Sequence, residues 1–174
     1  MQDFCKEVCV DNVKDAMRAV DLGANRIEYC SKLSEEGLTP EIEDVKYLLK
    51  NIKIPLRIMI RPHSKSFKYS EQDISIMLRD ISNFKKIDVD GIVIGCLKED
   101  DEIDIKKTNL LIDKARPLKV IFHKAIDMTS DPLKSLKNLI KNSNIDGVLT
   151  SGGSKKAVDG IKVLKKMQDI CPIN

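Results

Sequence analysis

Hydrophobic positions along the chain fall into two alternating patterns. Short apolar runs bounded by Gly, Pro, Asn or Asp predict strands, and longer stretches with apolar residues every three or four positions predict helices. The stretch "NRIEYC" (25–30), with Ile27 and Tyr29 at alternate positions after the helix end "VDLGA", illustrates the first pattern. Strands are predicted at 4–10, 25–30, 56–62, 90–97, 117–127 and 146–153. Helices are predicted at 11–23, 41–52, 70–87, 104–115, 131–142 and 155–170.

Capping signals support several of these helices. Asp11 is the expected N-cap of the first helix, and Gly23 is its expected stop. Ser70 followed by Asp73 at the third helical position indicates a capping box. Pro132 stands in the first turn of the helix at 131–142, where its missing N–H costs nothing.

Strict alternation of strands and helices predicts parallel βαβ units with right-handed crossovers. The segments "GANRIEYC", "DVDGIVIGC" and "NIDGVLTSG" form a weak internal repeat, as a barrel of such units would show. A closed α/β barrel has eight units and typically about 250 residues, whereas this chain has 174 residues and six predicted units. We therefore expect an α/β, TIM-barrel-like fold that lacks the last two strands, as one domain over 1–174, in preference to an open sheet.

Composition narrows the classes of function. The chain has 30 basic and 27 acidic residues, a net charge of +3 and 4% aromatic residues, so it shows neither the charge footprint nor the stacking platform of a nucleic-acid-binding protein. No apolar run approaches the roughly 20 residues of a membrane helix, and no signal peptide is visible. Five scattered cysteines argue against a disulfide framework. We expect a cytoplasmic protein.

Candidate site residues follow from side-chain alternation, because ligands of parallel α/β sheets collect at the carboxyl ends of the strands. Charged or soft side chains share one side of each strand: Glu7 and Cys9, then Glu28 and Cys30, then Arg57 and Arg61, then His123. Neighbouring strands lie about 4.8 Å apart, so we expect Glu7 beside Glu28, and Cys9 close enough to Cys30 for both thiols to hold one soft metal ion.

Structural interpretations remain open for each of these residues. Unpaired cysteine is common packing material, the two glutamates would also serve to brace arginines inside the barrel, and His123 would also fit a core position with its hydrogen bonds satisfied. A further stretch, "LTSGGSKKA" (149–157), predicts a strand, a glycine turn and a helix start. Backbone N–H groups of Ser151, Gly152 and Gly153 would then bind a phosphate or carboxylate, although the same stretch would equally be a plain connection.

Several segments resemble the CutC family of copper homeostasis proteins. They are "EVCVDNVKDAMRAVDLGANRIEYCSKLSEEGLTP", "IPLRIMIRP", "DGIVIGCLKEDDEID", "VIFHKAIDM" and "VLTSGG", which recur in order from about residue 4 to 165. The resemblance implies a TIM barrel, with Cys9 and Cys30 as Cu(I) ligands and Arg61 and His123 in the central cavity.

The chain departs from the family pattern in two places. The family continues with further strands, and the loop after the position of Arg61 usually reads Gly-Gly-Asp, where this chain has "HSKS" (63–66). Since unpaired strand edges are prone to pair with other chains, we expect a homo-oligomer that covers them.

The leading hypothesis is a copper homeostasis protein that binds or buffers Cu(I) through Cys9 and Cys30. The alternative is a barrel enzyme acting on a small anionic metabolite. In it Glu7 or Glu28 would be the general base, His123 the acid, and Arg61 with the "TSGG" turn (150–153) the anion site. A third hypothesis is an assembly-only relative without turnover. The expected binding partner is thus either a copper ion or a small anionic molecule. We expect neither a nucleic acid nor a membrane as a partner.

Overall fold

The computed structural model describes residues 4–171, and its centre is one six-stranded parallel sheet in the order β1-β2-β3-β4-β5-β6. The strands are β1 (Glu7–Val10), β2 (Arg26–Tyr29), β3 (Leu56–Met59), β4 (Gly91–Ile94), β5 (Lys119–Phe122) and β6 (Gly147–Val148). The helices are α1 (Val13–Asp21), α2 (Ile42–Asn51), α3 (Glu71–Lys85), α4 (Ile105–Ala115), α5 (Pro132–Asn142) and α6 (Ile161–Ile170). Two short 3₁₀ helices, η1 (Leu33–Glu35) and η2 (Lys124–Met128), follow β2 and β5.

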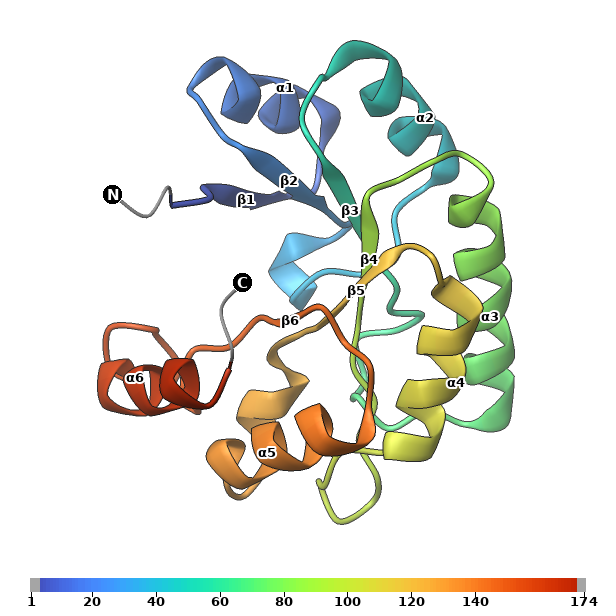
Figure 1. The fold of residues 1–174 in the computed structure, drawn as a ribbon. Coiled ribbons are helices and arrows are strands. Elements are labelled where there is room, and N and C mark those ends of the chain that lie inside the picture. Colours follow the sequence, from blue (N-terminus) through green and yellow to red (C-terminus); the bar gives the residue numbers. More distant parts are fainter. Residues whose placement is uncertain (1–3, 172–174) are drawn as a thin grey trace.

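The sheet is curved, and the helices lie around its outside from α1 to α6 (Figure 1). Each strand pairs in parallel with the next strand along the chain, and a helix lies between every two. The TIM-barrel-like α/β fold expected from the sequence is therefore confirmed. Within residues 4–171, β1 and β6 each have one paired neighbour, so the curved sheet has two edges.

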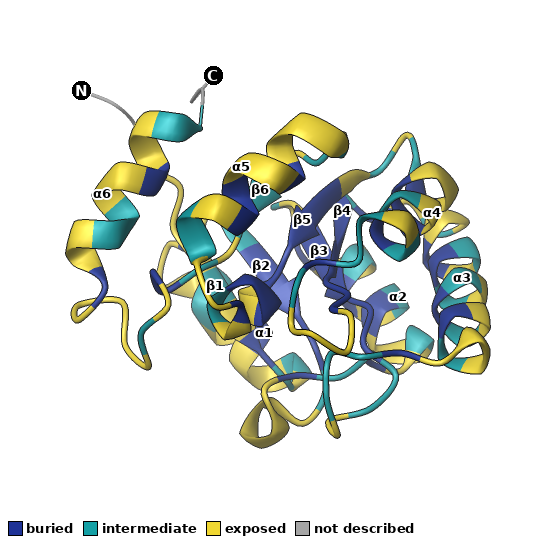
Figure 2. Cartoon of the chain, turned by 90° about the horizontal axis from the view of Figure 1, so that it is seen from below, coloured by how far each residue is buried: buried dark blue, intermediate teal, exposed yellow. Residues whose placement is uncertain are grey.

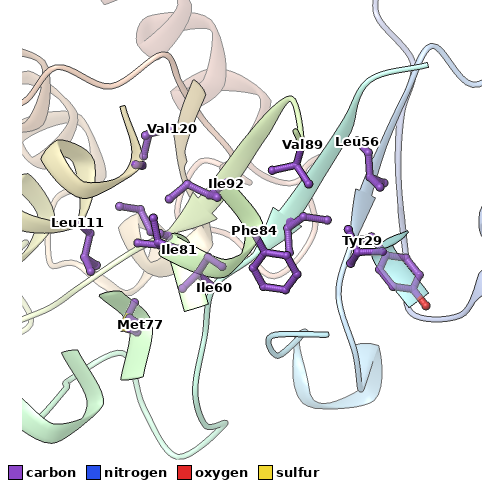
Figure 3. Packing of buried hydrophobic residues seen from close by; sticks show 14 of the residues in the cluster. Tyr29, Leu56, Ile60, Met77, Ile81, Phe84, Val89, Ile92, Leu111 and Val120 are labelled. Carbon is purple, nitrogen blue, oxygen red and sulfur yellow. The ribbon is translucent and has the colours of Figure 1, made fainter. Parts of the chain in front are cut away.

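The main core fills the space between the sheet and the helices. Figure 3 shows Met77 and Ile81 of α3 packed near Ile60 and Ile92, which all belong to one buried cluster. In Figure 2 the buried residues follow the strands and the helix faces turned toward them, whereas α6 is largely exposed. Met167 is the one buried residue of α6, just as Ala16 is the one buried residue of α1.

Helix starts agree with the sequence except at α1 and α6. Ser70 and Asp73 form the expected capping box of α3, and Pro132 stands at the start of α5. The N-cap of α1 is Asn12 rather than Asp11, because the Asn12 side chain accepts from the Asp15 N–H at 2.8 Å. The Asp11 carboxylate instead accepts from the Leu33 N–H at 2.9 Å and so ties η1 to the end of β1.

The last third of the chain departs from the predicted boundaries. The fifth strand ends at Phe122, because the chain turns at His123 into η2. The sixth strand is only Gly147–Val148, and α6 begins at Ile161 rather than at 155. Gly152 and Gly153 have φ of +69° and +73°, a left-handed conformation that glycine adopts readily and that breaks the strand without starting a helix.

Alternation along the strands gives the sheet an inner face as well. Cys30, Met59, Val93 and Ile121 form a small buried cluster of their own, separate from the core under the helices. No helix within residues 4–171 has the length and apolar character needed to cross a lipid bilayer.

Candidate functional site

A cavity of about 290 Å³ opens at the carboxyl ends of the strands. It is lined by Cys9, Glu28, Leu33, Glu36, Met59, Arg61, Phe67, His123, Lys124 and Leu149. These residues come from the carboxyl-terminal halves of β1, β2 and β3 and from the segments that follow strands. Ligands of parallel α/β folds bind at this end of the sheet, so the cavity is the candidate site.

Of the predicted cysteine pair, Cys9 lines this cavity and Cys30 is buried, and the pairing of the two strands differs from the one expected. Cys9 is paired with Glu28 across β1 and β2, and Cys30 lies one step further, where its N–H donates to the Val10 carbonyl at 3.0 Å. The two thiols are therefore diagonal neighbours. The interaction between the two thiols lowers the pKa of Cys30 and raises the pKa of Cys9, while the Cys30 thiol donates to the Val10 carbonyl at 3.6 Å.

Glu28 faces Cys9 directly. The Cys9 thiol lies 3.3 Å from Glu28 Oε1, in hydrogen-bonding distance for sulfur. Burial raises the pKa of Glu28, and the hydrogen bond from Cys9 opposes this effect in part. A raised pKa makes a carboxylate a stronger proton acceptor than an ordinary exposed one.

Glu7 belongs to a different part of the sheet, so its expected place beside Glu28 is wrong. Its register partner is Arg26, with which it forms an ion pair at 2.7 Å. Arg57 bridges Glu7 at 3.2 Å and Asp90 at 3.3 Å. This network spans the amino-terminal half of the sheet, away from the cavity lining, and bracing is the role that its contacts support.

Arg61 is buried, with 2% of its surface exposed, and lines the cavity. Its Nη1 donates to the carbonyls of Glu35 at 2.8 Å and Gly37 at 3.2 Å, so it fixes the segment that contains η1. The ring of Phe67 lies 4.5 Å from the guanidinium carbon, a cation–π contact.

His123 lines the cavity from the segment that follows β5, whereas β1 and β2 contribute other parts of the lining. Its Nδ1 accepts from the Ala125 N–H at 3.1 Å, so the neutral ring carries its proton on Nε2. Burial and the charge of Arg61 lower the pKa of His123 to about 3. The imidazole is therefore a neutral hydrogen-bond donor near neutral pH.

Gly95 makes room for this imidazole. A Cβ atom at position 95 would lie 2.4 Å from Cε1 and 2.5 Å from Nδ1 of His123. Only a residue without a side chain fits there.

The expected anion site at "TSGG" is already filled by the protein itself. The Asp127 carboxylate accepts from the backbone N–H groups of Ser151 and Gly153, both at 2.8 Å, and from the Ser151 hydroxyl at 2.9 Å. The Gly152 N–H donates to the Thr150 hydroxyl at 2.9 Å. No helix starts directly after Gly153, and the N–H groups expected to hold an external anion have internal partners.

Sequence reasoning did not single out Met59 as a ligand candidate. Its side chain lines the cavity, and it belongs to the same small buried cluster as Cys30. The register of β2 and β3 pairs Glu28 with Arg57, which places Cys30 and Met59 at the next level of the same face. The signal available in the sequence was the alternation that puts Met59 on the same side as Arg61.

The donor set decides what kind of metal would fit. Within residues 4–171 no three His, Cys, Asp or Glu side chains gather closely enough to hold a metal ion, Cys9, Glu28 and Cys30 included. This part of the chain therefore offers no preformed set of ligands for a hard cation or for a cation that requires octahedral coordination. A soft ion with a low coordination number needs fewer donors, and the thiol pair suits it.

Known proteins resemble this chain along most of its length. The sequence model of the CutC family matches residues 4–171. A human protein named copper homeostasis protein cutC homolog is 41% identical over 164 residues, which cover 94% of this chain and 60% of the human protein. A CutC family protein of Photobacterium profundum is 39% identical over 168 residues, which cover 97% of this chain and 68% of that protein. The chain thus spans about three fifths to two thirds of these relatives.

Solved structures agree in fold. A crystal structure of a CutC protein from Streptococcus agalactiae superposes with a TM-score of 0.85 at 29% identity, covering 94% of this chain and 80% of that one. An O-GlcNAc hydrolase of Thermobaculum terrenum superposes with a TM-score of 0.60 at 13% identity, covering 45% of its chain, and shows likeness of fold alone. The family model and the curated relatives together establish that this chain belongs to the CutC family.

Proposed function

We propose that this chain binds Cu(I) through Cys9 and Cys30 and serves copper homeostasis by buffering the ion. The observation that carries the proposal is the placement of the two cysteines as diagonal neighbours at the ends of β1 and β2, with Cys9 in the cavity lining and Cys30 buried. Cu(I) is a soft ion that prefers thiolate ligands and accepts low coordination numbers. The names of the curated relatives support a link to copper.

Binding requires that both thiols lose their protons. The interaction between the two thiols lowers the pKa of Cys30 and raises the pKa of Cys9, and the cation displaces both protons when it binds. Glu28 accepts from the Cys9 thiol at 3.3 Å, so this carboxylate is placed to receive the proton of Cys9. Two thiols and Cu(I) then give a dithiolate complex and two protons, one of them on Glu28.

A third soft donor lies beside the pair. The thioether of Met59 shares the buried cluster of Cys30 and the cavity of Cys9. Gly37 keeps this place open, because a Cβ there would lie 3.2 Å from Cys30 Sγ and 3.6 Å from Met59 Cε. We include Met59 in the proposed site as a neutral third ligand, which Cu(I) accepts and hard cations do not.

Titration of reduced protein with Cu(I) in competition with a chromophoric chelator tests the proposal. Cys9→Ser combined with Cys30→Ser should weaken Cu(I) binding by at least about 100-fold, the scale of losing both strong ligands. Cys5→Ser is the matched control, since Cys5 is also an exposed thiol near β1 but does not line the cavity. Unchanged affinity in the double variant would end the copper proposal.

The remaining expectations belong to the same proposal. One sheet contains all six strands, which supports a single domain. A cytoplasmic location suits the chemistry, because a reducing compartment keeps both thiols and copper reduced. The edges at β1 and β6 support self-association.

A further inference from the structure

We propose that the cavity also binds the carboxylate of a small organic acid, held between Arg61 and His123. This inference goes beyond copper binding, because it uses residues that directly follow β3 and β5 rather than the thiols of Cys9 and Cys30. It assigns a ligand class to the part of the cavity that the copper proposal leaves unused.

The first argument is the charge of Arg61. Its guanidinium group is buried, and its hydrogen bonds go to the neutral backbone carbonyls of Glu35, Gly37 and Ser64. Among residues 4–171 no carboxylate oxygen lies within 4.0 Å of its nitrogens, and its Nε has no hydrogen-bond partner. Burying an unpaired charge is costly. An anion in the cavity would supply the missing counter-charge.

The second argument is a donor without a partner on His123. The residue is 3% exposed, its Nδ1 is used by Ala125, and its Nε2 makes no hydrogen bond within the described part of the chain. A buried N–H that lacks an acceptor loses its hydration without compensation. Because the ring is neutral, this donor matches a carboxylate oxygen at any pH near neutrality.

Phe67 joins the two donors into one site. Its ring lies 4.5 Å from the guanidinium carbon of Arg61 and 4.8 Å from the ring centre of His123. Lys124, which is exposed, adds a second positive charge to the lining. Glu28 and the exposed Glu36, which also line the cavity, oppose an anion, so the proposed site lies beside Arg61 and His123.

The shape and walls of the cavity select a carboxylate with a short hydrocarbon body over a bare inorganic anion. A volume of about 290 Å³ lies at the small end of ligand sites. Leu33, Met59, Phe67 and Leu149 give it apolar walls. The "TSGG" turn does not contribute, since Asp127 takes the N–H groups of Ser151 and Gly153.

Copper-free, reduced full-length protein should be titrated with butyrate by calorimetry, and the imidazole nitrogens should be followed by NMR. We expect a Kd on the order of 1 mM for a ligand of this size, with a shift of the His123 Nε2 signal. The neutral isostere butyramide and inorganic phosphate should each bind at least about 10-fold more weakly. His123→Gln should weaken butyrate binding by a similar factor, and His63→Gln, the matched change outside the cavity, should leave it unchanged.

Butyramide binding as tightly as butyrate, or phosphate binding more tightly, would overturn the carboxylate assignment. So would butyrate binding that leaves the His123 signal in place. The NMR measurement uses the unaltered protein and therefore decides even if His123→Gln fails to fold. The copper titration of the cysteine variants does not affect the butyrate measurements. Each proposal can therefore be refuted without refuting the other.

Discussion

At the scale of single residues, the buried imidazole of His123 links the site to acid stability. Its pKa is lowered to about 3 in the folded chain, whereas a histidine in the unfolded chain titrates near about 6.5. Between these values the unfolded chain binds one more proton than the folded chain. The free energy of unfolding therefore rises with pH through this window and falls as pH drops from about 6.5 toward 3, by up to about 1.4 kcal/mol per pH unit.

Urea unfolding at several values between pH 4 and 7 measures this slope. In His123→Gln, the numbers of protons bound by the unfolded and the folded chain should differ by about one less than in the wild type. The free energy of unfolding of this variant should therefore depend less on pH in this range. His63→Gln serves as the control and should keep the wild-type dependence. Equal slopes for wild type and His123→Gln would show that the imidazole is not held neutral by the fold.

Met59 gives a second prediction at the residue scale. Met59→Leu keeps the volume and removes the thioether, so folding should change little, while Cu(I) affinity should fall by about 10-fold through loss of one weak ligand. Met77→Leu is the control, because Met77 is fully buried in the core under α3, away from the cavity. If Met59→Leu binds Cu(I) as tightly as wild type while the cysteine variants do not, copper is held by the thiols alone.

At the scale of elements, α3 depends on the capping box that the sequence predicts. The Ser70 hydroxyl accepts from the Asp73 N–H at 3.2 Å, and Asp73 Oδ2 accepts from the Ser70 N–H at 2.9 Å. Ser70→Ala should lower the free energy of unfolding by about 1 kcal/mol. Ser75→Ala, an exposed position within the same helix, should change it by less than about 0.5 kcal/mol. Chemical denaturation compares the two, and equal losses would argue against capping.

The turn after β6 depends on a contact that no local pattern announces. Asp127 on η2 and the segment 150–153 meet only in the folded chain, where the carboxylate accepts from Ser151 and Gly153. Asp127→Asn replaces one acceptor by an NH₂ group that faces donors. It should destabilise the turn by about 1–3 kcal/mol and speed amide exchange at Ser151 and Gly153. Asp159→Asn, on the exposed side of the same loop, should leave that exchange unchanged.

Periodicity predicted the elements well where it was long and uniform. The six strand–helix units, the parallel sheet and the cap at Ser70 all appear, because each is set by local pattern and by burial of one helix face. The boundaries near η2 and α6 were wrong, since they depend on the tertiary contacts of His123 and Asp127. Likewise, alternation identified the inner face of each strand, but only the register shows that Cys9 faces Glu28 while Glu7 faces Arg26.

At the scale of the whole molecule, the curved sheet separates two kinds of polar group. Ion pairs of Glu7, Arg26 and Arg57 occupy the amino-terminal half of the strands, where they satisfy one another. Arg61 and His123 at the carboxyl-terminal end keep unused donors beside the cavity. The paired charges stabilise the sheet, and the side chains with unused donors lie at the candidate site. The same curved sheet places both groups.

The two sheet edges lead to the last prediction. Within residues 4–171, β1 and β6 are each hydrogen-bonded on one side, and beside β6 lies a groove of about 650 Å³ whose walls include Val148, Leu164 and Met167. Unpaired strands next to apolar surface tend to associate. We expect light scattering to show dimers or larger species that dissociate on dilution. Leu164→Glu, which puts a charge into the groove, should shift the chain toward monomer, whereas Lys165→Glu on the exposed side of α6 should not. Circular dichroism and a cooperative unfolding transition would verify that both variants fold. A wild-type chain that stays monomeric at concentrations on the order of 100 μM, where contacts of even modest affinity form, would show that these edges are tolerated without a partner.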